Sequence, residues 1–269
     1  MVDLTQLINT NTWIISDSHF GHANVLLFEK IRLEYLADYN TDVVAEVHEL
    51  LTLINNLTFD ELRKDDRTTT LKKFLISYHD EMLIEKWNMQ VGVDDTIIHL
   101  GDFAFNNIEL FTSRLNGNKI LLRGNHDLKN KQTYLKAGFK EVIDEIRVLI
   151  NHNTFIKTPN IDKFWNGIFT DISLENNNFS ILFSHYPIYN NNAWDVKKYG
   201  KITETLEEIF NDVNGNLNIH GHIHNNTSIY KNSINVSTEV CTNLAPQTLE
   251  YHINQYIKDR NGSPIECRD

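Results

Sequence analysis

The sequence predicts a layered α/β domain, on three observations. The chain has 269 residues, of which 41% are hydrophobic and 23% charged, enough for one large domain with a single core. Five short apolar or β-branched runs are typical of buried strands, and a polar cluster rich in His, Asp or Asn follows each run. A long stretch with helical spacing separates the first run from the second. We therefore expect residues 1–269 to form a single domain.

The polar clusters come directly after the predicted strands. In order, the runs and clusters are Trp13–Ile15 before Asp17-Ser18-His19, Thr96–Ile98 before Gly101-Asp102, Ile120–Leu122 before Gly124-Asn125-His126-Asp127, Ile181–Phe183 before Ser184-His185, and Leu217–Ile219 before His220-Gly221-His222-Ile223-His224. In layered α/β folds the carboxyl ends of the strands form a common edge where ligands bind. The five clusters are therefore expected to meet at one edge.

Residues 29–86, between the first two runs, are predicted to be helical. Val43, Val47, Leu50 and Ile54 keep the spacing of one helix face. Because this segment leaves from the edge where the clusters gather, we expect a helical insertion that caps that edge. The alternative is that it covers a sheet face or forms a dimer contact. Residues 151–178 mix short apolar pieces with Asn-rich turns and predict irregular β structure.

Composition limits location and partners. No apolar run approaches the length of a bilayer span, and Met1–Thr12 has neither a basic start nor an apolar core, so we expect a cytoplasmic protein without membrane contact. The formal net charge of −11 argues against a broad basic face for duplex nucleic acid. A small or single-stranded substrate fits this charge better. The sequence leaves the oligomeric state open.

The residue types in the clusters are those of a metal site. Side chains at i and i+2 of an extended segment point the same way, so Asp17 and His19 can reach one ion together, as can His222 and His224. A carboxylate with imidazoles suits Mn²⁺, Fe, Zn²⁺ or Ni²⁺ better than Ca²⁺. A glycine before Asp102 lets the backbone turn sharply, so that this carboxylate can bridge two ions.

The ordered clusters resemble those of the calcineurin-like metallophosphoesterases. The matching set is Asp17-x-His19, Gly101-Asp102, Gly124-Asn125-His126-Asp127, His185 and Gly221-His222-x-His224. The run from Ser16 to Asn24, with Trp87-Asn88 and Ser184-His185-Tyr186-Pro187, further resembles a small bacterial and phage branch of that family.

The resemblance implies a four-layer αββα sandwich and a centre for two divalent metal ions, with Mn²⁺ favoured and Fe, Zn²⁺ or Ni²⁺ as alternatives. It implies one ion on Asp17, His19 and His224, a second on Asn125, His185 and His222, and Asp102 bridging them. It further implies that a hydroxide between the ions attacks phosphorus. His126 would then protonate the leaving oxygen as general acid. Asn125 is also expected to contact the substrate.

Some positions depart from the family or are less specific. In the protein serine/threonine phosphatase branch an Asp and an Arg stand where this chain has Phe105 and Asn106, which counts against a phosphoprotein substrate. His22 follows the first strand, and substrate contact and a structural role are both open for it. Trp194 is expected to serve in packing.

These residues predict a hydrolase for a phosphodiester or phosphomonoester, with a small nucleotide as the favoured substrate. A nuclease acting on single-stranded nucleic acid is the alternative, and a basic path of Lys and Arg to the metals would favour it. A catalytically silent binding protein with the same fold is a third hypothesis. Loss of a ligand or of His126 would indicate it, and none is lost.

Overall fold

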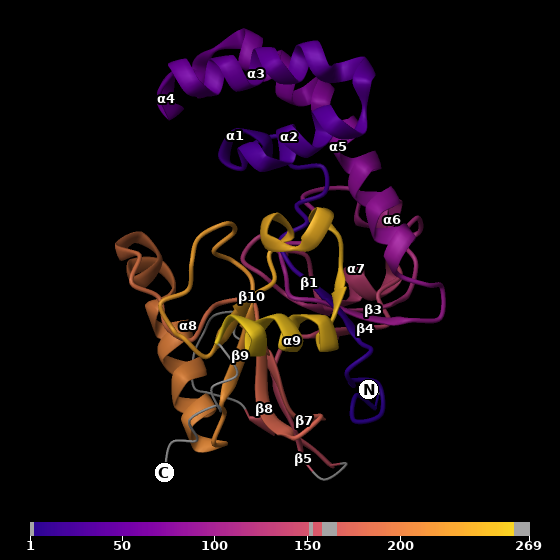
Figure 1. Cartoon of the computed structure of the whole chain (residues 1–269), viewed down its shortest axis with the longest axis vertical. Helices are drawn as coiled ribbons and strands as arrows, with labels where there is room; N and C mark the ends of the chain where they lie inside the picture. Colours follow the sequence, from indigo (N-terminus) through magenta and orange to yellow (C-terminus); the bar gives the residue numbers. More distant parts are fainter. Residues whose placement is uncertain (1–2, 151–152, 158–165, 261–269) are drawn as a thin grey trace.

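Two β-sheets form the centre of the computed structural model, which describes residues 3–150, 153–157 and 166–260 (Figure 1). The first sheet has the order β11-β1-β2-β3-β4 and the second the order β10-β9-β8-β7-β5-β6. The strands of the first sheet are β1 (Trp13–Ile15), β2 (Thr96–His99), β3 (Asn118–Leu122), β4 (Glu141–Ile143) and β11 (Gln247–Thr248). Those of the second are β5 (Ile146–Ile150), β6 (Asn153–Lys157), β7 (Gly167–Leu174), β8 (Asn177–Ser184), β9 (Leu217–His220) and β10 (Ser233–Asn235).

All five predicted strands are present, three in the first sheet as β1, β2 and β3 and two in the second as β8 and β9. Within each sheet these strands run parallel to one another. Their carboxyl ends therefore share an edge. The two sheets also meet there, because His185 Nδ1 after β8 lies 2.8 Å from the Leu100 carbonyl oxygen after β2.

Helices cover the sheets. α8 (Ala193–Asp212) packs on the second sheet, where Leu206 and Phe210 join Phe169 and Leu182 in one apolar cluster. The neighbouring Ile181 and Phe183 belong to the main core instead, as the alternation of a strand requires. α6 (Ile108–Thr112), α7 (Lys131–Lys136) and α9 (Leu249–Asp259) contribute to that main core. The predicted αββα sandwich is confirmed.

The segment between β1 and β2 is helical. It comprises α1 (Val25–Phe28), α2 (Lys30–Tyr39), the 3₁₀ turn η1 (Thr41–Val43), α3 (Val44–Asn56), α4 (Phe59–Lys64) and α5 (Asp66–Gln90). A capping box of Thr58 and Glu61 begins α4, and the Asp65 side chain accepts a hydrogen bond from Thr68 N at the start of α5. In Figure 1 these helices lie beyond one end of the sheets, and α5 runs back towards them. We call α1 to α5 the helical insertion.

The prediction of β structure for residues 151–178 is confirmed where the structure describes them, but the expectation that it is irregular is wrong. β7 and β8 pair as a regular antiparallel hairpin from the pair Ile168 and Phe183 to the pair Leu174 and Asn177, and β5 pairs with β6. Phe169 packs under α8, while Ile168 and Ile172 enter the main core. Both faces of β7 are therefore apolar, and its sequence lacks the polar–apolar alternation of a half-exposed strand. Residues 151–152 and 158–165 lie outside the described part. Among the described helices, none is long and apolar enough to cross a membrane.

Candidate metal centre

The loops after the strands hold five of the predicted metal ligands in an unusual backbone conformation. Asp17, His19, Asp102, His222 and His224 have φ angles of 58°, 52°, 56°, 69° and 50°. This left-handed region is uncommon for residues other than glycine and costs on the order of 1 kcal/mol or more each. Contacts between the loops maintain it, since Asp17 N donates to the Gly101 carbonyl and His19 N to the Asp102 carbonyl, both at 3.0 Å. Such strain gathers at functional sites.

Two glycines allow the loops to approach each other. Gly101 has a φ of 103°, and a Cβ there would lie 2.5 Å from Gly124 N. A Cβ on Gly221 would lie 2.0 Å from Ser16 Oγ and 2.4 Å from Asp17 Oδ2. Neither position accepts a larger residue without moving the ligand loops.

Asp17, His19 and His224 form the first group, which we call the first metal site. One ligand atom from each lies within 4.8 Å of the others. Asp17 Oδ2 accepts hydrogen bonds from His222 N at 2.8 Å and from the Ser237 hydroxyl at 2.9 Å. Asp17 Oδ1 and both ring nitrogens of His19 are buried without a hydrogen-bond partner. Buried polar atoms are rarely left unsatisfied, so these atoms fit a metal ion as their partner.

Asp102 lies between this group and the next. Its Oδ2 is 3.7 Å from His19 Nε2 and also 3.7 Å from His185 Nε2. Its Oδ1 accepts a hydrogen bond from His126 N at 2.8 Å, which fixes the carboxylate plane. Asp17, Asp102 and His185 form a second cluster of atoms within 4.8 Å. This position is compatible with the predicted bridging role.

Asn125, His185 and His222, the residues predicted to hold the second ion, lie close together, and we call them the second metal site. Asn125 Oδ1 lies 3.1 Å from His185 Nε2, so these two side chains are together. His222 is adjacent, with its ring centre 5.1 Å from that of His185. Its Nε2 faces Asp195 Oδ1 at 3.4 Å. A proton on Nε2 would leave the His222 Nδ1 lone pair free for an ion.

The electrostatics of the centre require positive charge. Burial and the Asp17 carboxylate raise the pKa of Asp102 to about 7, because a second buried negative charge is unfavourable without a counter-ion. Burial alone would lower the pKa of His224, but its hydrogen bond to Glu239 and the charges of Glu239 and Asp17 raise it to about 9. Metal binding would therefore displace a proton from His224.

His126 stands beside Asp102 with its side chain 42% exposed and its Nε2 3.9 Å from Asp102 Oδ2. Burial, followed by the charge of His185, lowers its pKa to about 4. The Phe105 ring lies 4.8 Å from the His126 ring and is stacked on His22 at 3.6 Å. Phe105 thus contacts the predicted acid where the other branch has a carboxylate. His22 is in the same aromatic group and does not line the cavity described next.

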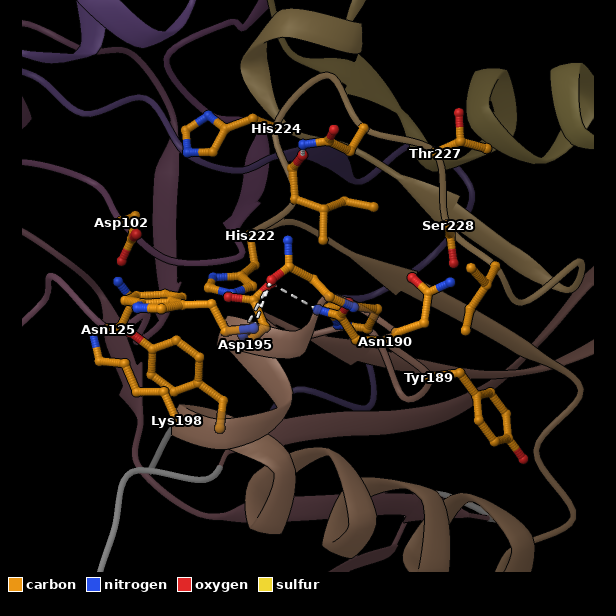
Figure 2. A pocket seen from close by; sticks show the side chains of 18 of the residues that line it. Asp102, Asn125, Tyr189, Asn190, Asp195, Lys198, His222, His224, Thr227 and Ser228 are labelled. Carbon is orange, nitrogen blue, oxygen red and sulfur yellow. Dashed lines mark hydrogen bonds and ion pairs between the residues drawn. The ribbon is translucent and has the colours of Figure 1, made fainter. Parts of the chain in front are cut away.

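A cavity of about 500 Å³ opens beside Asp102, Asn125 and His126. Figure 2 shows its walls, which come from the start of α8 and from the loop after β9. Its lining is rich in Asn, and Lys198 is the one Lys or Arg among the lining residues of the described chain. Trp194 also lines it and is 61% exposed, so it lies outside the core, and its ring packs against Tyr199 at 5.9 Å.

Sequence reasoning missed four residues of this region. Arg32 and Glu239 lie behind the first metal site, and Asp195 and Lys198 lie at the second. None belongs to a cluster that follows a strand. The burial of Arg32 in α2, which calls for a partner, is visible only in the structure.

Comparison with known proteins decides the family. The model of the calcineurin-like phosphoesterase family matches residues 10–226. The chain belongs to this family. No curated protein matches it. Among solved structures it is similar to the crystal structure of AQ665, a protein of unknown function from Aquifex aeolicus, with 22% identity, a TM-score of 0.52, and coverage of 91% of this chain and 97% of that one. At this identity the likeness shows the fold alone.

Family and geometry agree on the chemistry available. The unsatisfied oxygen and nitrogen atoms around Asp102 form a mixed set suited to divalent transition-metal ions. The residues of this calcineurin-like phosphoesterase thus fit the metals that its family implies. Which ion occupies each position, and the roles of Asn125, His126 and His222, remain predictions.

Proposed function

We propose that the chain is a dinuclear, metal-dependent hydrolase of a small phosphate ester, a phosphodiester or phosphomonoester such as that of a nucleotide. The observation that carries the proposal is the position of Asp102 Oδ2, 3.7 Å from a histidine of each metal site and at the wall of an open cavity. Two bound cations would supply a Lewis acid and a nucleophilic water of lowered pKa.

The residues of the chain then act on the substrate. Asn125 and Lys198 are placed to contact phosphoryl oxygens, since both line the cavity beside Asp102. His126 is exposed enough to reach a leaving oxygen and to donate a proton to it. His126 has to be protonated for this step, and the negative charge of a bound phosphate favours that form.

The residues that line the cavity favour a small substrate rather than single-stranded nucleic acid. A strand of nucleic acid is usually followed by a row of basic and aromatic side chains. Here the described lining contains one Lys or Arg, Lys198, and the exposed aromatic ring of Trp194, whereas Asn is its most frequent residue type. The acidic Asp195 also lines the cavity. The Asn-rich walls suit hydrogen bonds to the polar part of a nucleotide.

Hydrolysis of a substrate panel by the purified chain with Mn²⁺ tests the proposal. The panel comprises bis-p-nitrophenyl phosphate, p-nitrophenyl phosphate, cyclic nucleotides and single-stranded DNA, and chelator-treated protein is the control. We expect Mn²⁺-dependent hydrolysis of one or more small esters. Preference for DNA would establish the nuclease instead, and inactivity on every ester with two metals bound would indicate a binding protein.

A further inference from the structure

We propose that the helical insertion holds the first metal site in shape, with Arg32 of α2 and Glu239 as positioning residues for Asp17 and His224. The inference rests on the proposed metal-dependent function. It assigns the insertion a role at the ligands themselves, whereas a cap would act on access to them. Glu239 also lies beyond residues 10–226, which the family model matches.

Arg32 ties the insertion to the loop of the first ligands. It is fully buried, and its guanidinium donates to the Asp17 carbonyl at 2.6 Å and to the Ser18 carbonyl at 2.9 Å. These carbonyls belong to the strained turn that presents Asp17 and His19. Arginine has donors in a rigid fork, so it holds two carbonyls and a carboxylate at once. Lysine cannot reproduce that geometry.

Glu239 connects Arg32 to His224, the third predicted ligand of the first metal site. Its Oε1 accepts from Arg32 Nε at 2.6 Å and lies 3.1 Å from His224 Nδ1. A carboxylate that receives the Nδ1 proton of a histidine fixes the ring and leaves Nε2 for a metal. One buried ion pair therefore links Asp17 and Ser18, the residue before His19, to His224, across 207 positions of sequence between Arg32 and Glu239.

A second contact from the insertion reaches the same loop. Asp80 on α5 accepts a hydrogen bond from Gly21 N at 3.0 Å. Arg32 and Asp80 thus both hydrogen-bond to residues 17–21, and within the described residues neither has a hydrogen bond to Asn125, His185 or His222. The insertion also contributes no lining residue to the cavity. These contacts favour a support for the first metal site over a cover for the second.

Glu29, His224 and Glu239 could in principle form a further cation site, because their ligand atoms also lie within 4.8 Å of one another. Arg32 is paired with Glu239 at that place and already supplies a positive charge. An additional divalent ion would face this guanidinium directly. We therefore assign the group to positioning.

The test is Glu239→Gln, which keeps the size of the side chain and removes its charge. Mn²⁺ binding to the metal-free protein is measured by titration calorimetry and by metal analysis after dialysis at fixed free Mn²⁺. We expect two metal equivalents in the wild type. In the variant, one equivalent should bind about 10–100-fold more weakly, the usual effect of losing such a partner, while the other keeps most of its affinity.

Glu141→Gln is the matched control. Glu141 is also buried and ion-paired with a fully buried arginine, Arg147, but on β4 and β5 and away from the ligands. A merely structural effect would lower the melting temperature of both metal-free variants alike. The rise in melting temperature on adding Mn²⁺ should shrink in Glu239→Gln alone.

Two Mn²⁺ affinities in Glu239→Gln within twofold of those in Glu141→Gln would overturn the inference, as would equal weakening of both equivalents. If Glu239→Gln does not fold, Arg32→Lys decides by the same measurement, because it keeps the charge and loses the fork. Selective weakening of one equivalent supports the role, and unchanged binding refutes it. A wild type that binds no metal would refute the proposed function and this inference with it.

Discussion

The two proposed metal sites differ in what surrounds them. Behind the first, Arg32, Glu239 and Ser237 contact the ligand loop or the ligands themselves from two parts of the chain, and all three are buried. The second faces a cavity whose wall carries the exposed side chains of Trp194 and Lys198. The first site is backed by buried side chains, although its ligand His224 also lines the cavity, and the second lies where the cavity opens to solvent and to a substrate.

This difference suggests a division of roles between the halves of the centre. A rigid first site would keep its ion through turnover, and an open second site would admit the ester and release the product. Substitutions behind the first site should therefore change metal content. Substitutions in the cavity should change kinetics while metal content stays the same.

Asp102→Asn should have the largest effect, because Asp102 belongs to both halves. The amide keeps the shape of the side chain but loses the charge that offsets two adjacent cations. We expect both metal occupancy and turnover to be abolished, as measured by metal analysis and by ester hydrolysis. A purified variant that still carried two metals and full activity would show that Asp102 does not bridge them.

His126→Ala comes next and tests whether the open half performs the proton transfer. The variant should fold and keep both metals, yet lose roughly 10²–10⁴-fold in rate on esters with poor leaving groups, the usual contribution of a positioned general acid. p-Nitrophenyl esters need little protonation of the leaving group and should lose less. An equal loss on activated and natural esters would remove the general-acid role.

Most of the predicted ligands of both metal sites could be found in the sequence, because each follows a strand directly and belongs to a short local motif. A strand such as Ile97 to His99 followed by Gly101 and Asp102 has a local pattern, and the order of such patterns indicated the family. The sheet edge where they meet then followed from the rule for carboxyl ends. The boundaries between the helices of the insertion could also be predicted from nearby residues, since polar residues such as Asp65 cap these helices.

The supporting residues could not be predicted, because their role depends on contacts between distant segments. Arg32 meets Glu239 across 207 positions, and neither has a distinctive neighbour in sequence. Asp195 reaches His222 only because α8 packs on the second sheet and presents its first turn to the loop after β9. Phe105 likewise gave no sign that it would stack on His22 beside the predicted acid.

Lys198→Met should have the smallest effect and isolates substrate binding at the open half. The Lys198 ammonium lies 4.4 Å from the Trp194 ring and 4.9 Å from the Tyr199 ring, on the side of the cavity where Figure 2 shows Asn125. Methionine keeps much of the apolar stem against these rings and removes the charge that would meet a phosphoryl oxygen. We expect KM to rise about tenfold, equivalent to ~1.4 kcal/mol, with metal content unchanged.

Lys197→Met provides the matched control for this last prediction. Lys197 is the exposed neighbour of Lys198 in α8 and does not line the cavity. Both substitutions remove one positive charge from the same helix, so a general effect of charge on substrate encounter would be common to both. If Lys198→Met raises KM no more than Lys197→Met does, the phosphate contact belongs to other residues. The open half would then bind its substrate through the metals and the amide side chains.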